Sequence, residues 1–292
     1  MSAPPSATAI ESDVVTFSLL GQPVAVRSKE PQVFAAYRRL YRHFPEIPPT
    51  PEAHLVEIIE HANDESGHWE ALVEYLPSHR HATLGQALHR AEVRLCSHAL
   101  LHSTDVIGLH TSTIAFGDEL ALVTGDSGSG KTTLTLSLSA RGFPVDGDDI
   151  AVLDPLTGLV RGMPRCFHLD SASIEMLAEQ GLDVDSKQVC EGFLTPGDVG
   201  DGHMLPRRVR AIFFLTPDNL AEPIATPIAH SEAAAKLDGQ TGPRHLPSLE
   251  LFAAFSTMLR DARCFELRRG PLGTTADLVI GTMKRLQEGA PL

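Results

Sequence analysis

The first hundred residues alternate between strand-like stretches and stretches with helical spacing. Residues 14–26 are strand-like, with Gly21-Gln22-Pro23 as the expected turn, which predicts a hairpin. Apolar positions at helical spacing predict a helix over 31–43 and a longer one over 84–101. A rigid proline-rich connector and two apolar stretches lie between these elements (45–51, 55–59 and 71–76).

From about residue 106 the pattern changes to short buried strands mixed with helices. Strands are predicted at five places (107–110, 113–116, 120–123, 150–153 and 211–215), and helices at three (171–180, 248–260 and 272–288). The stretch from Gly192 to Gly202 is rich in Gly and Asp, which predicts a mobile loop. We therefore expect a flexible tail over 1–12, a smaller α+β lobe over 13–104 and an α/β domain with a mixed central sheet over 105–292.

One segment gives conflicting signals. From Thr133 to Ser139 leucines alternate with Ser and Thr, as they would in a strand. Leu134 and Leu138 also share one face of a helix, and Arg141 followed by Gly142 suits a helix C-terminus. We predict a helix here.

Bulk composition is that of an ordinary globular protein. Of 292 residues, 42% are hydrophobic and 21% charged, and the formal net charge is -13. An acidic chain argues against general nucleic-acid binding, because neutralising phosphates needs a basic face. The N-terminus has no secretory pattern and no apolar run approaches a membrane span, so we expect a cytoplasmic protein without a membrane partner.

The four cysteines do not form a metal or disulfide pattern. None is arranged as C-x-x-C, and their spacing suits neither a zinc site nor a dense disulfide framework. They are interpreted as scattered reduced thiols of a cytosolic protein.

A glycine-rich loop follows the strand predicted at 120–123. It fits the P-loop pattern G-x-x-x-x-G-K-[ST] in full, and a helix is expected after it. In such a loop the backbone N–H groups and the helix N-terminus hold phosphates, Lys131 reaches the β- and γ-phosphates, and the hydroxyl of Thr132 is a Mg²⁺ ligand. The predicted nucleotide-binding residues are Gly125, Asp126, Ser127, Gly128, Ser129, Gly130, Lys131, Thr132 and Thr133.

An acidic cluster follows the loop at the start of the next predicted strand. Asp148 and Asp149 are adjacent, so one carboxylate can hold Mg²⁺ while the other accepts the proton of an attacking hydroxyl. A Walker B acid would instead follow an apolar strand, and Asp154 occupies such a position. Because Asp154-Pro155-Leu156-Thr157-Gly158 is typical of a turn, we favour Asp148 and Asp149.

Together with His110, fifteen residues before Gly125, these features resemble the catalytic domain of the HPr kinase/phosphorylase family. That family combines a His, a G-D-S-G-x-G-K-[ST] loop, a helix ending in R-G-x and an adjacent Asp pair. The resemblance covers about residues 105–154. It implies a P-loop kinase core of the HPr kinase / PEP carboxykinase type. Asp148 would be the acid/base, His110 would support that carboxylate, and Asp149 would lie on the metal side.

The chain also departs from the family pattern. Thr133 stands where the family usually has Glu, and the later E-I-R-G-L-G-I signature is absent. The missing signature puts the phosphorylase reaction and HPr itself in doubt. An arginine is expected to neutralise charge in the transition state, and the basic candidates are Arg161, Arg165, Arg207 and Arg208.

The combined prediction is an ATP- and Mg²⁺-dependent kinase that phosphorylates a hydroxyl, a Ser of a protein or precursor peptide. Two alternatives stay open: a small-molecule kinase on the same scaffold, and a nucleotide-binding regulatory protein without transfer activity. The sequence contains no motif that separates ATP from GTP. The resemblance further implies a homo-oligomer, because the family usually forms hexamers.

Overall fold

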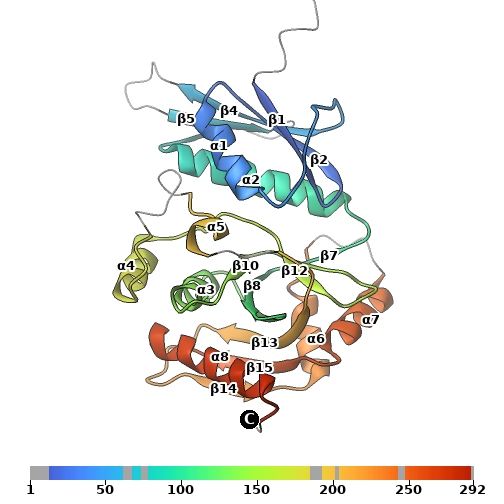
Figure 1. Cartoon of the computed structure of the whole chain (residues 1–292), viewed down its shortest axis with the longest axis vertical. Helices are drawn as coiled ribbons and strands as arrows, with labels where there is room; N and C mark the ends of the chain where they lie inside the picture. The colour runs from blue at the N-terminus through green and yellow to red at the C-terminus, as the bar shows by residue number, and fades with distance from the viewer. Residues whose placement is uncertain are drawn as a thin grey trace, which may run out of the picture. The chain divides into compact units, whose positions relative to one another are not determined.

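The computed structural model of the chain divides into two compact units. Unit 1 comprises Met1–Ser103 with Cys190–Phe193, and unit 2 comprises Thr104–Val189 with Leu194–Leu292 (Figure 1). The structure describes residues 13–61, 68–73, 78–184, 193–200, 204–242 and 247–290. Within these ranges, none of the helices has both the length and the apolar character needed to span a membrane.

Unit 1 is built on a mixed sheet of six strands in the order β3-β1-β2-β4-β5-β6. Only β2 and β4 run parallel, and the other neighbours are antiparallel. Its strands are β1 Val14–Leu19, β2 Gln22–Ser28, β3 Glu46–Ile47, β4 His54–His61, β5 His68–Val73 and β6 His79–His81. Its helices are α1 Pro31–Leu40 and α2 Leu84–His102.

The expected hairpin is present, but its turn lies one residue earlier than predicted. Leu20 and Gly21 form the connection, both with positive φ, as in two-residue loops of type I′. Pro23 lies inside β2, opposite Ser18. The turn prediction was wrong by one residue because Gly21 is the second residue of the turn and Leu20 is the first.

Apolar faces at helical spacing join the helices of unit 1 to its sheet. On α1 the buried residues are Val33, Ala36, Tyr37 and Leu40, which follow the predicted helical period. Helix α2 packs on β4 and β5. The hydroxyl of Tyr37 donates to the carbonyl of Leu88 at 2.9 Å, so this buried phenol is satisfied within the core.

Unit 2 contains a second six-stranded mixed sheet, in the order β10-β8-β9-β13-β15-β14. Three neighbouring strands, β9, β13 and β15, run parallel, and the outer strands are antiparallel to their neighbours. The strands are β8 Thr111–Phe116, β9 Glu119–Thr124, β10 Val145–Gly147, β13 Arg208–Thr216, β14 Ile224–Pro227 and β15 Arg263–Arg268.

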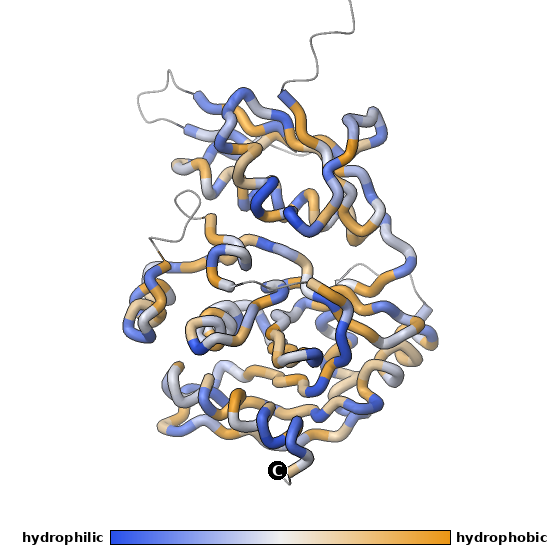
Figure 2. The backbone as a smooth tube through the Cα atoms, viewed as in Figure 1, coloured by the Kyte–Doolittle hydropathy of each residue, from blue (hydrophilic) through white to orange (hydrophobic). Residues whose placement is uncertain are grey.

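Helices cover both faces of this sheet (Figure 1). Along β13, Ala211, Phe213 and Leu215 pack towards α3 and α8, while Ile212 and Phe214 pack towards α6 and α7. Figure 2 shows hydrophobic residues along these strands. Because both faces are buried, the strand is a continuous apolar run. The helices are α3 Lys131–Ala140, α6 His230–Asp238, α7 Ser248–Leu259 and α8 Leu272–Gln287.

A three-stranded sheet completes unit 2, in the order β12-β11-β7. Its strands are β7 Ile107–Leu109, β11 Ala151–Leu153 and β12 Val160–Gly162, and two more helices are α4 Ser171–Glu179 and α5 Pro196–Val199. Helix α5 lies within the stretch predicted to be a mobile loop. Residues 193–195 and 200 flank this helix, and residues 192 and 201–202 lie outside the described residues.

Helix α3 explains the alternating leucines at 134, 136 and 138. Leu134 and Leu138 pack against the sheet, whereas Leu136 joins a separate cluster with Val145 and Leu177. Because α3 is buried on two sides, its leucines occur at alternate positions, as apolar residues do in a strand. At its end, Gly142 has φ 85° and the next residue's N–H bonds to the Leu138 carbonyl, which closes the helix as predicted.

Candidate phosphate-binding and catalytic site

The P-loop lies where β9 ends and α3 begins. Strands β9, β13 and β15 are parallel, so their carboxyl ends meet at one edge of the sheet. In open α/β sheets this edge is where ligands bind. The loop from Gly125 to Gly130 therefore shares an edge with the segments that follow β13 and β15.

The loop backbone is shaped for close contact. Gly125, Gly128 and Gly130 all have positive φ. A Cβ on Gly125 would lie 2.5 Å from the carbonyl oxygen of Leu215, so only glycine fits where the loop passes β13. No side chain caps α3, and its first-turn N–H groups have no partner within the helix.

Lys131 lies inside the loop. It is 5% exposed, and its Nζ donates to the carbonyl oxygens of Gly125 at 2.8 Å and Asp126 at 3.1 Å. Burial lowers the pKa of this ammonium group, while the charges of Asp149, Asp148 and Asp126 oppose the shift. The ammonium group thus donates to two carbonyls of the loop and interacts electrostatically with the acid pair, Asp148 and Asp149.

Asp148 connects the acid pair to the P-loop. It is 2% exposed, and its carboxylate accepts hydrogen bonds from Thr132 Oγ1 at 2.7 Å and from Ser112 Oγ of β8 at 2.5 Å. Burial raises the pKa of Asp148 although the two hydroxyl hydrogen bonds lower it. Two segments 16 residues apart are therefore joined through a carboxylate that binds protons more readily than an exposed one.

Asp149 lies in a different environment from its neighbour. Its side chain is 41% exposed, and its two oxygens lie 2.6 Å from His110 Nε2 and 2.6 Å from Arg165 Nη1. Burial alone would raise the pKa of Asp149, but the His110 hydrogen bond and the charges of Arg165, His110 and Lys131 outweigh it and lower the pKa to about 2. Asp149 is therefore the member of the pair whose ionised form is favoured.

The position of His110 corrects one sequence prediction. We expected His110 to support Asp148, but it contacts Asp149. Asp149 has φ 66°, and the N–H of Ile150 bonds to the carbonyl of Asp148 at 2.8 Å. This left-handed turn points the two adjacent carboxylates to different neighbours, and strained backbone of this kind gathers at functional sites. Nδ1 of His110 lies 3.1 Å from Gln240 Oε1.

A backbone crossing fixes the segment before the acid pair. A Cβ on Gly147 would lie 2.6 Å from the Met163 carbonyl oxygen, and one on Gly162 would lie 2.3 Å from the backbone of Asp146. Strands β10 and β12 thus approach more closely than side chains would allow.

Of the four arginines suggested by the sequence, only Arg165 contacts the acid pair. It is 8% exposed. Arg207 pairs with the fully buried Asp146 at 2.6 Å, and Arg208 is exposed and lies 3.9 Å from Asp261. Arg161 lies in β12 and is half-buried.

One arginine of the site was not suggested by the sequence. Arg269 follows β15, and its Nη1 donates to the carbonyl of Ser129 in the P-loop at 3.1 Å. Its Nε is buried without an acceptor among the described residues. The available signal was a basic residue directly after the strand β15, Arg263–Arg268, but the strand itself was not predicted.

Asp154, the alternative Walker B residue, lies in a turn. Its carboxylate accepts from the N–H groups of Leu156 at 2.8 Å and Thr157 at 3.2 Å. It follows β11, which belongs to the three-stranded sheet and not to the sheet that holds the P-loop. This carboxylate is used locally, as the turn interpretation expects.

The residues present fit a magnesium-bound triphosphate. Thr132, Asp148 and Asp149 offer hydroxyl and carboxylate oxygens, which are the ligands that Mg²⁺ prefers. The Ser129 hydroxyl, in a residue 2% exposed, is a buried polar group without a partner among the described residues. Such an orphaned hydroxyl beside an uncapped helix is suited to an anionic ligand.

Comparisons with known proteins were made by sequence and by structure. No family model and no curated protein matches the chain. Among solved structures it is similar to the HPr(Ser) kinase/phosphatase from Coxiella burnetii, with 11% identity, a TM-score of 0.33, and coverage of 62% of this chain and 98% of that chain. A likeness at this score supports no conclusion about function.

Proposed function

We propose that this protein is an ATP- and Mg²⁺-dependent kinase that transfers the γ-phosphoryl group to a hydroxyl group, a Ser of a protein or precursor peptide. The observation that carries the proposal is the hydrogen bond between Thr132 of the P-loop and Asp148. It brings a phosphate-binding loop and a buried acid together. A protein that only binds nucleotide has no need of a base.

The contrast between the two carboxylates supports a division of roles. Burial raises the pKa of Asp148, whereas the pKa of Asp149 is lowered to about 2. Pairs of titratable groups whose environments separate their pKa values mark acid/base assignments. Asp148 is therefore proposed as the proton acceptor, and Asp149 as the fixed negative charge beside the metal.

In the proposed reaction the acceptor oxygen forms a bond to the γ-phosphorus, and the bond from that phosphorus to the β–γ bridging oxygen breaks. The acceptor's proton passes to Asp148, and the products are a phosphate ester and ADP. Lys131 and the N–H groups of the loop hold the triphosphate. Arg165 and His110 keep Asp149 ionised and oriented.

Mg²⁺, when bound, would neutralise the charge of the β- and γ-phosphates. Thr132 and Asp149 are the residues proposed to hold it. The hydroxyl of Thr132 donates a hydrogen bond to Asp148. The lone pairs of the Thr132 oxygen therefore remain available to a cation.

The test is phosphoryl transfer from γ-labelled ATP with Mg²⁺ to a whole lysate and to candidate Ser peptides. We expect label on a protein or peptide with the wild type and none with Asp148→Asn. The matched control is Asp154→Asn, which removes a nearby carboxylate that only closes a turn and should keep full transfer.

The other outcomes separate the alternatives. Full transfer by Asp148→Asn would refute its role as base. Label confined to a small molecule would indicate a metabolite kinase. Absence of label, with ATP binding that Lys131→Ala abolishes, would indicate a nucleotide-binding regulator.

A further inference from the structure

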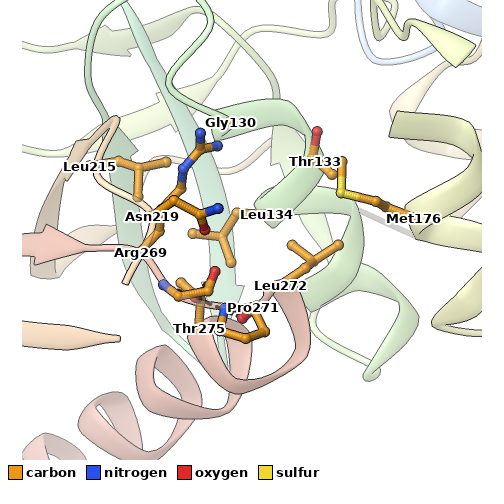
Figure 3. Close-up of a pocket in the computed structure, with 11 residues that line it drawn as sticks. Gly130, Thr133, Leu134, Met176, Leu215, Asn219, Arg269, Pro271, Leu272 and Thr275 are labelled. Carbon is orange, nitrogen blue, oxygen red and sulfur yellow. Dashed lines mark hydrogen bonds between the residues drawn. The ribbon is translucent and has the colours of Figure 1, made fainter. Parts of the chain in front are cut away.

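A cavity of about 260 Å³ adjoins the P-loop (Figure 3). Its wall includes Gly130 and Leu134 from the start of α3, and Leu215 at the end of β13. Arg269, which follows β15, and Leu272, at the start of α8, also line it. The cavity thus lies at the edge where the parallel strands end.

The lining combines apolar side chains with a few polar groups. Leu134, Leu215 and Leu272 provide apolar surface, while the amide of Asn219 and the guanidinium of Arg269 provide polar groups (Figure 3). Small-molecule sites share this composition: mostly apolar walls with a small number of orienting polar groups. A nucleobase has the complementary character, with two apolar faces and a polar edge.

The cavity is continuous with the phosphate-binding backbone. Gly130 belongs both to the P-loop and to the cavity wall. Arg269 spans the two, because its guanidinium donates to the Ser129 carbonyl and would lie 2.7 Å from a Cβ on Gly130. A group in the cavity and phosphates on the loop can therefore belong to one ligand.

We propose that this cavity holds the nucleoside of the bound triphosphate, with Asn219 contacting the edge of the base. The proposal extends the proposed function to the identity of the base and relies on the same P-loop. A side-chain amide pairs with the adjacent donor and acceptor of adenine. Guanine would favour a carboxylate, but the described residues that line the cavity include no Asp or Glu, and Asp218, the sequence neighbour of Asn219, accepts from Arg268 at 2.9 Å. The arrangement assigns adenine over guanine.

The experiment compares three ligands by calorimetry on the full chain: ATP, GTP and inorganic triphosphate, each with Mg²⁺. Two variants alter the cavity, Asn219→Ala and Met176→Trp. Met176 lines the cavity and is 41% exposed, so a larger side chain there narrows the cavity from its rim. The matched control is Leu249→Trp on α7, where the side chain is 83% exposed and away from the lining.

With the wild type we expect ATP to bind at least about tenfold more tightly than GTP or triphosphate. Both cavity variants should weaken ATP about tenfold and leave triphosphate unchanged, and Asn219→Ala should remove the preference over GTP. Leu249→Trp should bind all three as the wild type does.

Each failure has a distinct pattern. If triphosphate binds and the cavity variants leave ATP unaffected, the nucleoside lies elsewhere and this inference is wrong while the P-loop proposal stands. A wild-type preference for GTP would overturn the adenine assignment. If neither ATP nor triphosphate binds the wild type, this inference and the proposed function both fail.

Discussion

The two units contain mixed sheets of equal strand number that differ in strand direction. In unit 1 only β2 and β4 are parallel, so the ends of neighbouring strands alternate between the two edges. In unit 2, β9, β13 and β15 are parallel and adjacent. Their carboxyl ends bring the P-loop, Asn219 and Arg269 to one edge. Strand direction, and not strand number, creates the site.

The units also differ in the polar groups that they bury. In unit 1 the buried Tyr37 and Ser28 hydroxyls donate to backbone carbonyls, and these contacts complete the core. The charged residue buried in the described part of unit 1 is Glu92 on α2, whereas unit 2 buries several charged groups at its parallel edge, among them Lys131, Asp148 and Arg165. Burying charge is unfavourable unless it is paired, so these residues are better explained by ligand chemistry than by stability.

The strongest test of this contrast is Lys131→Ala. Removal of the buried ammonium should weaken ATP binding or transfer by about 100-fold or more, because Lys131 is proposed to hold the phosphates. The matched control is Lys236→Ala, since Lys236 lies on α6 and pairs with Glu232 at 3.7 Å on the surface. Titration with labelled ATP measures both, and equal affinity in the two variants would contradict the assignment.

The closeness of β9 and β13 is tested by Gly125→Ala. Its Cβ would meet the Leu215 carbonyl oxygen at 2.5 Å and φ is +154°, so we expect a loss of about 3 kcal/mol in the free energy of unfolding. Gly117→Ala also has positive φ but open space, and should lose only about 1 kcal/mol. Urea denaturation compares the two, and equal losses would show that the loop can relax away from β13.

The support of Asp149 is tested by Arg165→Met. Loss of the buried guanidinium leaves the His110 contact as the remaining side-chain hydrogen bond described for Asp149. Transfer should fall about tenfold to a hundredfold, because Arg165 would orient a carboxylate that is proposed to hold Mg²⁺. Arg208→Met is the control, because Arg208 is exposed and its nearest carboxylate oxygen is 3.9 Å away. The ratio of the two kcat values is the measurement. A ratio near one would show that Arg165 does not support transfer.

The smallest predicted effect concerns Asp149 and pH. Because its pKa is lowered from 3.8 to about 2, its ionised form stabilises the folded state above pH 4, and this contribution is lost as the pH falls towards 2. If the side chain were fully buried, this pKa shift would contribute roughly 2 kcal/mol to the free energy of unfolding. Because the side chain is 41% exposed, solvent screens the charge and about 1 kcal/mol is expected. Urea unfolding of Asp149→Asn should differ from wild type by this amount at pH 7 and converge with it near pH 2.

Local sequence signals predicted the elements that carry their own signature. The P-loop motif, the strand before it and the helix after it were all found, because glycine spacing and capping residues act within a few positions. Helix α6 was missed: only Ala233 and Leu237 are buried on it, too few to produce a visible period. Residues brought to the site from a distance were harder, and Arg269 is 140 positions from its partner Ser129.

The pairing of His110 could not be predicted for a different reason. Asp148 and Asp149 are adjacent, so spacing alone cannot say which of them faces the histidine. The left-handed turn at Asp149 decides it, and an Asp in that conformation has no reliable sequence signal.

The crossing of Gly147 and Gly162 has a consequence for mutational tolerance. If every position of the chain were randomised and folded variants selected, both positions should return glycine alone, whatever the ligand or activity. Exposed loop positions such as Ser127 should instead vary freely under that selection and become restricted only when nucleotide binding is required. Two successive selections would therefore distinguish the residues required for folding from those required for nucleotide binding.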